Sequence, residues 1–253
     1  MSHVLVASTA FLLVFASALL GLYIRGRLPD HHLSEESSSA IKLAVGLVAT
    51  IAALVLGLLI SSAKASFDTV NNDFVHNAAD IVRLDLALAE YGPQTALLRA
   101  ELKESYSAWI ELLSSPQEAR TVRLDNAEII GNMERFQHQV AQLTPHTDVQ
   151  RQLQARALNI TDDVFNTRSR ALLQRGVGIP AALLVVLVLW LAIIFGTFGI
   201  LAPRNATIIV AFFLCAISSA GAIFLILEMD TPLAGIVRVS IGPMQEAVLR
   251  LGR

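Results

Sequence analysis

Long stretches of this 253-residue sequence contain no charged side chain at all. Charged residues make up only 16% of the chain and hydrophobic residues 54%, a balance that soluble globular proteins do not have. The formal net charge is −2, and acidic and basic residues are interspersed, so the chain lacks the positive field that attracts nucleic acid. We therefore expect the lipid bilayer to surround much of the chain, and we expect no nucleic-acid partner.

The residues that most catalytic and metal sites need are also missing. Cys215 is the only cysteine, so it can form neither an intramolecular disulfide nor a cluster of thiolate ligands. The sequence has no glycine-rich phosphate loop, no G-x-S-x-G motif and no H-E-x-x-H motif. His31 and His32 are adjacent in a loop, where a solvated pair is a simpler interpretation than two metal ligands. The sequence thus predicts that the protein is not an enzyme and has no catalytic residue, cofactor or bound metal.

Four hydrophobic runs have the length of a membrane span. They cover residues 4–24, 41–63, 177–201 and 206–227, and none has an Asp, Glu, Lys, Arg or His in its interior. At about 1.5 Å per residue each run extends over roughly 30 Å, the thickness of the hydrocarbon core. The first run has no Lys or Arg before it and is too long for a signal peptide, so we interpret it as a span. The sequence predicts an all-α polytopic membrane protein, with four transmembrane helices in two pairs that flank a helical-bundle domain.

The stretch between the two pairs, residues 64–176, is polar and has helical spacing throughout. Phe67, Phe74, Ile81 and Leu88 recur every seven residues, which indicates that the second spanning helix continues into water. Three further segments each carry an apolar stripe. Their apolar positions are Leu98, Leu102, Trp109 and Leu113, then Val122, Ile129, Met133, Phe136, Val140 and Leu143, then Leu153, Ala157, Ile160, Val164 and Ala171. We expect an antiparallel four-helix bundle or long paired helices bent at prolines, and the heptad spacing leaves a coiled coil between subunits open.

Short polar segments join and follow the spans. Ser34, followed by Glu35 and Glu36, is typical of the capped start of the second spanning helix. The connection at 202–205 is so short that the third and fourth spans must form a tight hairpin. Gly and Pro break the tail at 229–253, which suits a segment at the membrane interface or packed against the helical domain. The predicted divisions are a first helix pair with a charged loop (1–63), the helical domain (64–176), a second hairpin (177–228) and an interfacial tail (229–253).

Small residues at helical spacing occur in every span and permit close approach of helices. We interpret them as packing contacts within one subunit rather than as a pore lining. They are Ser17, Gly21, Gly46, Gly57, Gly196, Gly199, Ala216, Ala220 and Gly221.

With four spans, both termini and the helical domain share one side of the membrane. Seven basic residues near span ends or in the tail lie on that side, and four lie on the other. The first set is Lys64, Arg168, Arg170, Arg175, Arg238, Arg250 and Arg253, and the second is Arg25, Arg27, Lys42 and Arg204. The positive-inside rule therefore predicts a cytoplasmic helical domain and cytoplasmic termini.

Charge-free spans argue against an ion-coupled transporter, which needs ionisable groups at mid-depth, and they remain compatible with a channel formed between subunits. Glu228 and Asp230 lie directly at the end of the fourth span, and Asp68 follows the second. These acids can form a ring at a pore mouth, or Glu228 and Asp230 can pair with Arg238 and anchor the tail. We favour the structural pairing.

Two parts of the sequence resemble a known family. Residues 200–207 and 224–240, the latter with an E-x-D-x-P-x-x-G segment, look like the C-terminal signature of a bacterial family of integral membrane proteins of unknown function that is labelled bestrophin-like. The signature residues are Pro203, Arg204, Asn205, Pro232 and Gly235. The N-terminal part is similar at Glu36, Ile41, Gly46, residues 56–60, Ala65, Phe67 and Asp68. The resemblance covers nearly the whole chain.

This resemblance implies an oligomeric ion channel, because true bestrophins are oligomeric anion channels in which membrane segments flank a helical cytosolic region. The present sequence has no acidic run like the bestrophin calcium clasp, so calcium gating is not implied. We predict a homo-oligomeric channel or channel-like protein for small ions, anions in particular, in the inner membrane of a bacterium. The alternative is a non-conducting membrane sensor or scaffold whose helical domain binds a ligand or a protein partner.

Overall fold

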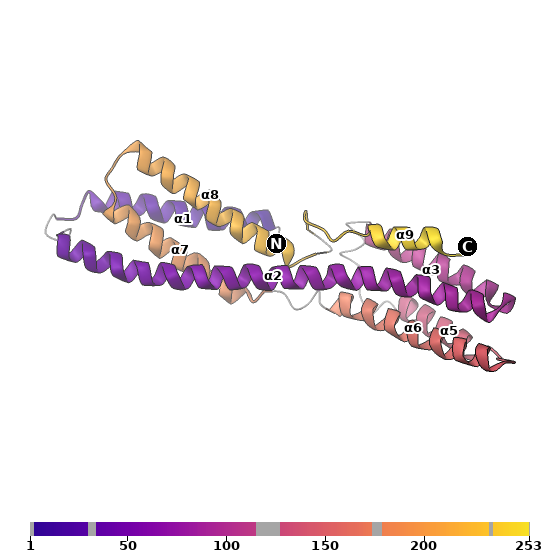
Figure 1. Cartoon of the computed structure of the whole chain (residues 1–253). Coiled ribbons are helices and arrows are strands. Elements are labelled where there is room, and N and C mark those ends of the chain that lie inside the picture. The colour runs from indigo at the N-terminus through magenta and orange to yellow at the C-terminus, as the bar shows by residue number, and fades with distance from the viewer. Residues whose placement is uncertain (1–2, 30–33, 115–126, 174–178, 233–234, 253) are drawn as a thin grey trace. The chain divides into compact units, whose positions relative to one another are not determined.

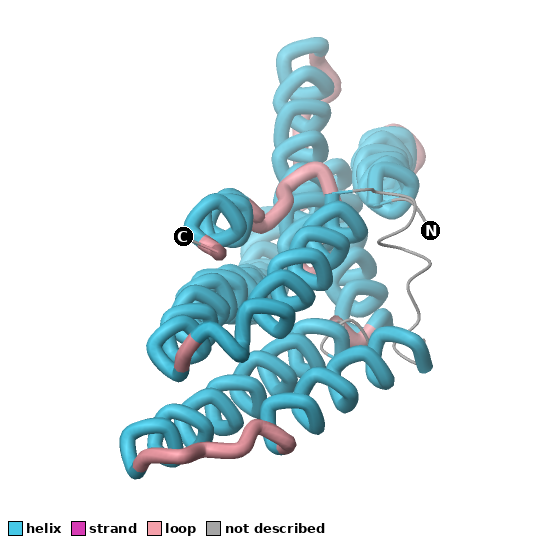
Figure 2. Tube along the Cα trace, turned by 90° about the vertical axis from the view of Figure 1, so that its right-hand side faces the viewer, coloured by secondary structure: helices cyan, strands magenta, loops and turns pink. Residues whose placement is uncertain are grey.

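The computed structural model describes residues 3–29, 34–114, 127–173, 179–232 and 235–252 (Figure 1). Every regular element in these ranges is a helix, and no strand occurs among them (Figure 2). The loop with His31 and His32, Val122, Arg175 and the predicted start of the third span at 177 lie outside the described residues, as do the side chains of residues 127–130 and 168–173. The predicted all-helical fold class is confirmed.

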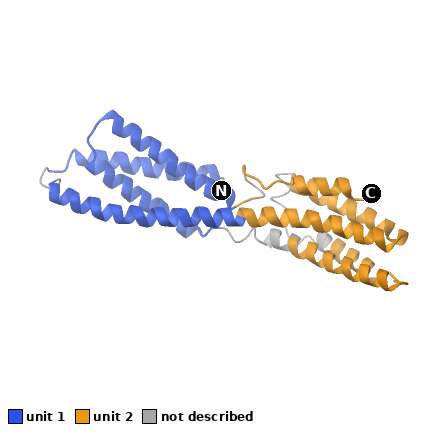
Figure 3. Cartoon of the chain, viewed as in Figure 1, with its two compact units in different colours: residues 1–66, 179–230 blue, residues 67–178, 231–253 orange. Residues whose placement is uncertain are grey.

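The chain forms two compact units, shown in blue and orange in Figure 3. The first consists of Met1–Ser66 and Ile179–Asp230, and the second of Phe67–Gly178 and Thr231–Arg253. Most of the predicted tail, Thr231–Arg253, groups with the second unit, which agrees with the second of the two predicted alternatives, a tail packed against the helical domain.

Four helices of the chain are long and apolar enough to cross a membrane, as predicted. They are α1 (His3–Arg25), α2 (Glu35–Tyr91), α7 (Ala181–Leu201) and α8 (Ala206–Met229). Helix α2 has 57 residues, and its apolar first part belongs to the first unit while its polar second part belongs to the second. The predicted continuation of the second span into the helical domain is therefore confirmed.

The ends of these helices follow from local chemistry. The Ser34 hydroxyl accepts a hydrogen bond from the Ser37 N–H at 3.3 Å, which caps α2 as predicted. Helix α7 begins at Ala181, and Pro180 occupies its N-cap position with an extended ψ of 122°. Proline has no N–H to contribute inside a helix, and it is tolerated at a start.

In the first unit α1 packs along α7 and α8. A Cβ atom on Gly21 would overlap the carbonyl oxygen of Gly196, and one on Gly199 would overlap that of Ala18. The Ser17 hydroxyl donates to the carbonyl of Ala192 on α7 at 2.9 Å. The backbones of α1 and α7 therefore touch where both helices carry small residues, and the predicted packing role within one subunit is confirmed for these residues of α1 and α7 alone.

The remaining small residues of the spans divide into two groups. Ala216 and Ala220 are buried within the unit. Gly46, Gly57 and Gly221 are exposed, and a Cβ added to any of them would meet no atom within 4 Å. The buried core of the unit consists of Ala10, Val45, Ala52, Leu59, Ala63, Leu187, Ile194, Ile223 and Ile226.

The second unit is built around the polar part of α2. It also contains the short helix η2 (Pro93–Thr95), α3 (Ala96–Ser114), α5 (Ala127–Ala141), α6 (Asp148–Leu173) and α9 (Gly242–Arg250). Residues of α2, α3, α5, α6 and α9 share one apolar core. Its buried members include most of the predicted stripe positions, namely Phe74, Ile81, Leu88, Leu98, Leu102, Trp109, Leu113, Phe136, Val140, Ala157 and Val164. The predicted bundle of four helices thus gains a fifth, α9, which packs against α3.

A tight turn reverses the chain between α2 and α3. Gly92 has a φ of 135°, a left-handed value that costs other residues steric strain. The buried hydroxyl of Thr95 donates to the carbonyls of Leu88 and, at 2.8 Å, Gly92. These bonds satisfy carbonyl groups that the end of α2 leaves without helical partners.

Candidate functional site

The predicted acidic residues at the end of the fourth span are held within the membrane unit. Glu228 lies in the last turn of α8 and is buried, and its Oε1 lies 2.8 Å from Nδ1 of His3 in the first turn of α1. Oδ2 of Asp230 accepts a hydrogen bond from the backbone N–H of Ile179 at 3.0 Å, just before α7 begins. Both carboxylates therefore connect α8 to the starts of other spans in the same copy. Their exposure at a pore mouth stays a prediction.

The other two predicted candidates, Arg238 and Asp68, belong to the second unit. Arg238 donates from Nε to the carbonyl of Gly235 at 2.8 Å, and the N–H of Val239 donates to the carbonyl of Pro232 at 3.0 Å. The carbonyl groups of the signature residues Pro232 and Gly235 thus accept hydrogen bonds from residues that precede α9. Asp68 is half-buried near the start of the polar part of α2. The pairing of Arg238 with the two carboxylates of the first unit stays a prediction.

The signature residues of the α7–α8 connection close the opposite end of the membrane unit. Arg204 donates from Nε and Nη2 to the carbonyls of Leu22 and Tyr23 at 2.9 and 2.8 Å, and so satisfies the end of α1. The side-chain oxygen of Asn205 accepts from the N–H of Ile208 at 2.9 Å and caps α8. Pro203 lies in the turn between α7 and α8.

Arg25 does for α7 what Arg204 does for α1. Its Nη1 donates to the carbonyl of Leu201 at 2.6 Å, at the last residue of α7. A cation beside a helix C-terminus also offsets the negative end of the helix dipole. The two arginines therefore connect the C-terminal end of α1 to α7 and to the α7–α8 turn. This structural role of the signature residue Arg204 was not predicted from the sequence.

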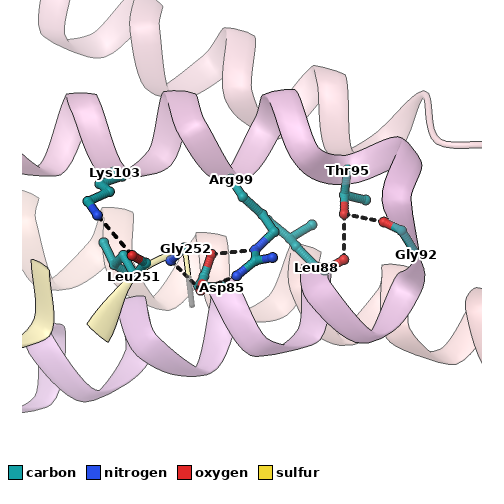
Figure 4. A network of polar contacts seen from close by, with 8 residues as sticks. All are labelled: Asp85, Leu88, Gly92, Thr95, Arg99, Lys103, Leu251 and Gly252. Carbon is teal, nitrogen blue, oxygen red and sulfur yellow. Dashed lines mark hydrogen bonds and ion pairs between the residues drawn. The ribbon is translucent and has the colours of Figure 1, made fainter. Parts of the chain in front are cut away.

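A polar network in the second unit was not predicted from the sequence (Figure 4). Asp85 on α2 forms a two-pronged ion pair with Arg99 on α3, at 2.7 Å to Nε and 2.9 Å to Nη2. The backbone N–H of Gly252 donates to the same carboxylate at 3.1 Å, and Lys103 donates to the carbonyl of Leu251 at 3.0 Å. The network thus fixes the end of the tail to the α2–α3 hairpin through backbone atoms.

One signal in the sequence does point to this pair. Asp85 and Arg99 lie the same number of residues before and after Gly92, so a hairpin at Gly92-Pro93 brings them to the same level. Burial by itself raises the pKa of Asp85, but hydrogen bonds from Arg99 and Gly252, with the charges of Arg99 and Lys103, outweigh it and hold the pKa below its ordinary value of 3.8. The hydrogen bond to Asp85 raises the pKa of Arg99 in turn. Both groups are therefore charged at neutral pH.

The spanning part of α2 presents an open apolar face. Leu43, Leu47, Leu54 and Leu58 are all strongly exposed, up to 75% for Leu43. The open glycines Gly46 and Gly57 lie beside them at helical spacing. This face combines large apolar side chains with positions where another backbone can approach closely.

Comparison with known proteins agrees with this arrangement of helices. The sequence profile of a family described as the bestrophin-like domain matches residues 12–244. Among solved structures, the chain is similar to a mutant form of a bacterial bestrophin homolog from Klebsiella pneumoniae, with a TM-score of 0.65, 14% sequence identity and coverage of 96% of each chain. At this identity the likeness concerns the fold. No match was found among curated proteins.

Proposed function

This chain belongs to the bestrophin-like domain family, and on that premise we propose that it is an oligomeric membrane channel. Several copies surround one pore for small ions, with anions as the preferred cargo. The channel resides in the inner membrane of a bacterium, and the helical unit and both termini face the cytoplasm.

The observation that carries this proposal is the closed interior of a single membrane unit. Leu187, Ile223 and Ile226 are buried at its centre, and Ala18 and Val14 fill the contact of α1 with its neighbours. The interior that the four helices share is lined by apolar side chains, which cannot replace the hydration shell of an ion. Conduction by this chain therefore requires a pore between copies.

The open face of α2 is the surface that best suits such a pore. A ring of leucines such as Leu47, Leu54 and Leu58 from several copies would form an apolar constriction, which gates by losing its water. The open glycines Gly46 and Gly57 allow neighbouring helices to approach without a clash. Lipid also covers exposed leucines, so the role of this face needs a direct test.

The preference for anions is supported by the arginines at one end of the membrane unit. Arg25 and Arg204 cap helix ends there, and the guanidinium of Arg27 lies 4.0 Å from the centre of the Tyr23 ring. Among the described residues none of the three arginines has a carboxylate partner. Positive charges without acidic partners raise the local concentration of anions at a pore entrance.

The test is ion flux through liposomes that contain the purified full-length protein, with chloride and potassium compared in parallel. The oligomeric mass of the same preparation is measured in detergent. We expect a defined oligomer and chloride flux well above that of empty liposomes. A folded oligomer that passes neither ion over a range of pH and voltage would contradict the proposal and favour the sensor or scaffold.

A matched pair of variants tests the role of α2. Leu54→Asn adds a polar group to the open face of α2, and Leu189→Asn adds the same group to an exposed position of α7. Wetting an apolar constriction lowers its barrier, so we expect Leu54→Asn to raise flux several-fold and Leu189→Asn to leave it unchanged. Equal effects of both variants would argue against a pore lined by α2.

A further inference from the structure

We propose that the polar part of α2 carries an assembly seam, on which a second copy of this chain packs in parallel. The seam consists of Val75, Ala79, Val82, Leu86 and Ala89. This inference rests on the oligomeric state in the proposed function, and it names the surface that holds the copies together outside the membrane.

The seam is a second apolar face on a helix whose first apolar face is already covered. Phe74, Ile81 and Leu88 point into the core of the second unit. Most of the seam lies on a different side of the helix, where Val75 and Leu86 remain 43% and 60% exposed and Ala79 is exposed as well. Val82 is half-buried at the border of the two faces and also packs against the core.

This part of α2 lies outside the predicted membrane spans, which makes the exposure informative. Exposed leucines in the spanning part of the helix can face lipid, whereas Leu86 lies among charged neighbours such as Asp80, Arg83 and Glu90. Isolated apolar residues on a protein surface are common, but five in a helical row form a contact surface.

The spacing of the seam fits a second copy in particular. Its residues alternate at four and three positions, the heptad pattern of helices that pack side by side. Copies inserted in one membrane have the same orientation, so their α2 helices run parallel and like residues meet at the same level. The same heptad positions earlier in α2 are held by Leu47, Ile51, Leu54 and Leu58, the face assigned to the pore.

Charged residues at the edge of the seam also favour a second copy as the partner. A groove at Leu86, between α2 and α6, is lined by the charged residues Arg83, Glu90 and Arg156, together with Ala87 and Ala89. Opposite charges along one rim allow ion pairs between neighbouring copies, as charges that flank a coiled-coil seam do. An unrelated protein has no reason to match the heptad spacing, so we assign the seam to self-association.

The first experiment compares Leu86→Glu with Val149→Glu in the full-length protein. Both side chains are 60% exposed, but Val149 lies on α6 outside the seam. We expect Leu86→Glu to place like charges opposite one another and to raise the concentration for half-dissociation in detergent by at least tenfold. Val149→Glu should keep the wild-type mass. A wild-type monomer, or a Leu86→Glu protein with the wild-type mass, would overturn the inference.

A second experiment avoids a charged substitution in the seam, which can disturb the folding of the helix. In a Cys215→Ser background, Leu86→Cys and Val149→Cys are treated with a short bismaleimide crosslinker in native membranes. We expect covalent dimers of this chain from Leu86→Cys alone. Crosslinking to another protein instead, or equal dimer yields from both variants, would assign the seam a different role.

These results can be separated from the flux measurement. An oligomer that depends on Leu86 but passes no ions would leave the seam in place and remove the channel. Ion flux from an oligomer whose mass does not change in Leu86→Glu would support the channel and rule out the seam.

Discussion

At the scale of single residues, Asp85 determines how the tail is attached. Its carboxylate is buried, yet it stays charged because Arg99 and the N–H of Gly252 both donate to it. Lys103 holds the neighbouring carbonyl of Leu251. The carboxylate therefore serves two connections at once, between α2 and α3 and between α2 and the tail.

Replacing Asp85 by Asn should weaken both connections. The amide keeps the size of the side chain but leaves the guanidinium of Arg99 without its counter-charge in a mostly buried place. Removing one partner of a buried pair costs about 3–5 kcal/mol, and we expect roughly 2–3 here because Arg99 retains some contact with water. Hydrogen exchange of the α9 amides should become faster, and the melting temperature in detergent should fall by roughly 5–10 °C.

The control for this variant is Asp148→Asn. Asp148 pairs with Arg151 at 2.7 Å on the surface of α6, where both side chains are exposed. Exposed pairs contribute at most about 1 kcal/mol, so this change should leave the tail protected. Equal exchange rates in the two variants would show that Asp85 does not hold the tail.

The same carboxylate gives the tail a defined response to acid. A pKa below 3.8 in the folded protein means that the contribution of Asp85 to stability is complete above that value. It is lost as the pH falls through the lowered pKa, when the carboxylate takes up a proton. The difference in α9 exchange between wild type and Asp85→Asn should accordingly be constant from neutral pH to about pH 5 and should vanish only in stronger acid.

At the scale of helices, the contact of α1 with α7 depends on the absence of side chains. Gly21 and Gly199 lie where any Cβ atom would overlap the backbone of the opposite helix. In a bilayer, helix association relies on such close packing because lipid chains are as apolar as leucine.

Gly21→Val should therefore separate α1 from α7. Overpacking a well-packed contact costs about 1–3 kcal/mol, so we expect the melting temperature in detergent to fall by several degrees. Gly221→Ala is the matched control, since a Cβ at Gly221 meets nothing within the copy and alanine favours a helix. An unchanged melting temperature for Gly21→Val would contradict the tight contact.

The elements that the sequence predicted well are those with local, periodic signals. The spans follow from long uncharged runs, and the buried face of α2 follows from the heptads of Phe74, Ile81 and Leu88. The place of the tail could not be derived in the same way. Its attachment depends on the N–H of Gly252 and the carbonyl of Leu251. Almost every residue has these backbone groups, so the sequence does not indicate which of them form such bonds.

The same limit applies to the signature residues. Arg204 was predicted only as a signature residue of the family, and the structure shows that it donates to the carbonyls of Leu22 and Tyr23, far away in the chain. Glu228 likewise meets His3, a contact that joins the two ends of the membrane unit's sequence. Without knowledge of which helices are neighbours, the sequence alone cannot distinguish such anchors from residues that face an ion.

At the scale of the whole molecule, the order of the helices fixes which segments share a side of the membrane. His3 meets Glu228, so the start of α1 and the end of α8 lie at one end of the membrane unit. Arg25 meets Leu201, so the ends of α1 and α7 lie at the other. The α7–α8 turn at Pro203 therefore lies at the end of the membrane unit opposite to the start of α1 and the end of α8.

Cysteine labelling of cells tests which of these sides is the cytoplasm. In a Cys215→Ser background, Pro203→Cys and Leu249→Cys place single thiols at exposed positions of the turn and of α9. The excess of basic residues on the domain side predicts that a membrane-impermeant maleimide labels Pro203→Cys in intact spheroplasts and labels Leu249→Cys only after permeabilisation. The reverse pattern would place the helical unit outside the cytoplasm, where a sensor has access to external ligands, whereas labelling of both positions in intact cells would contradict the four-span arrangement itself.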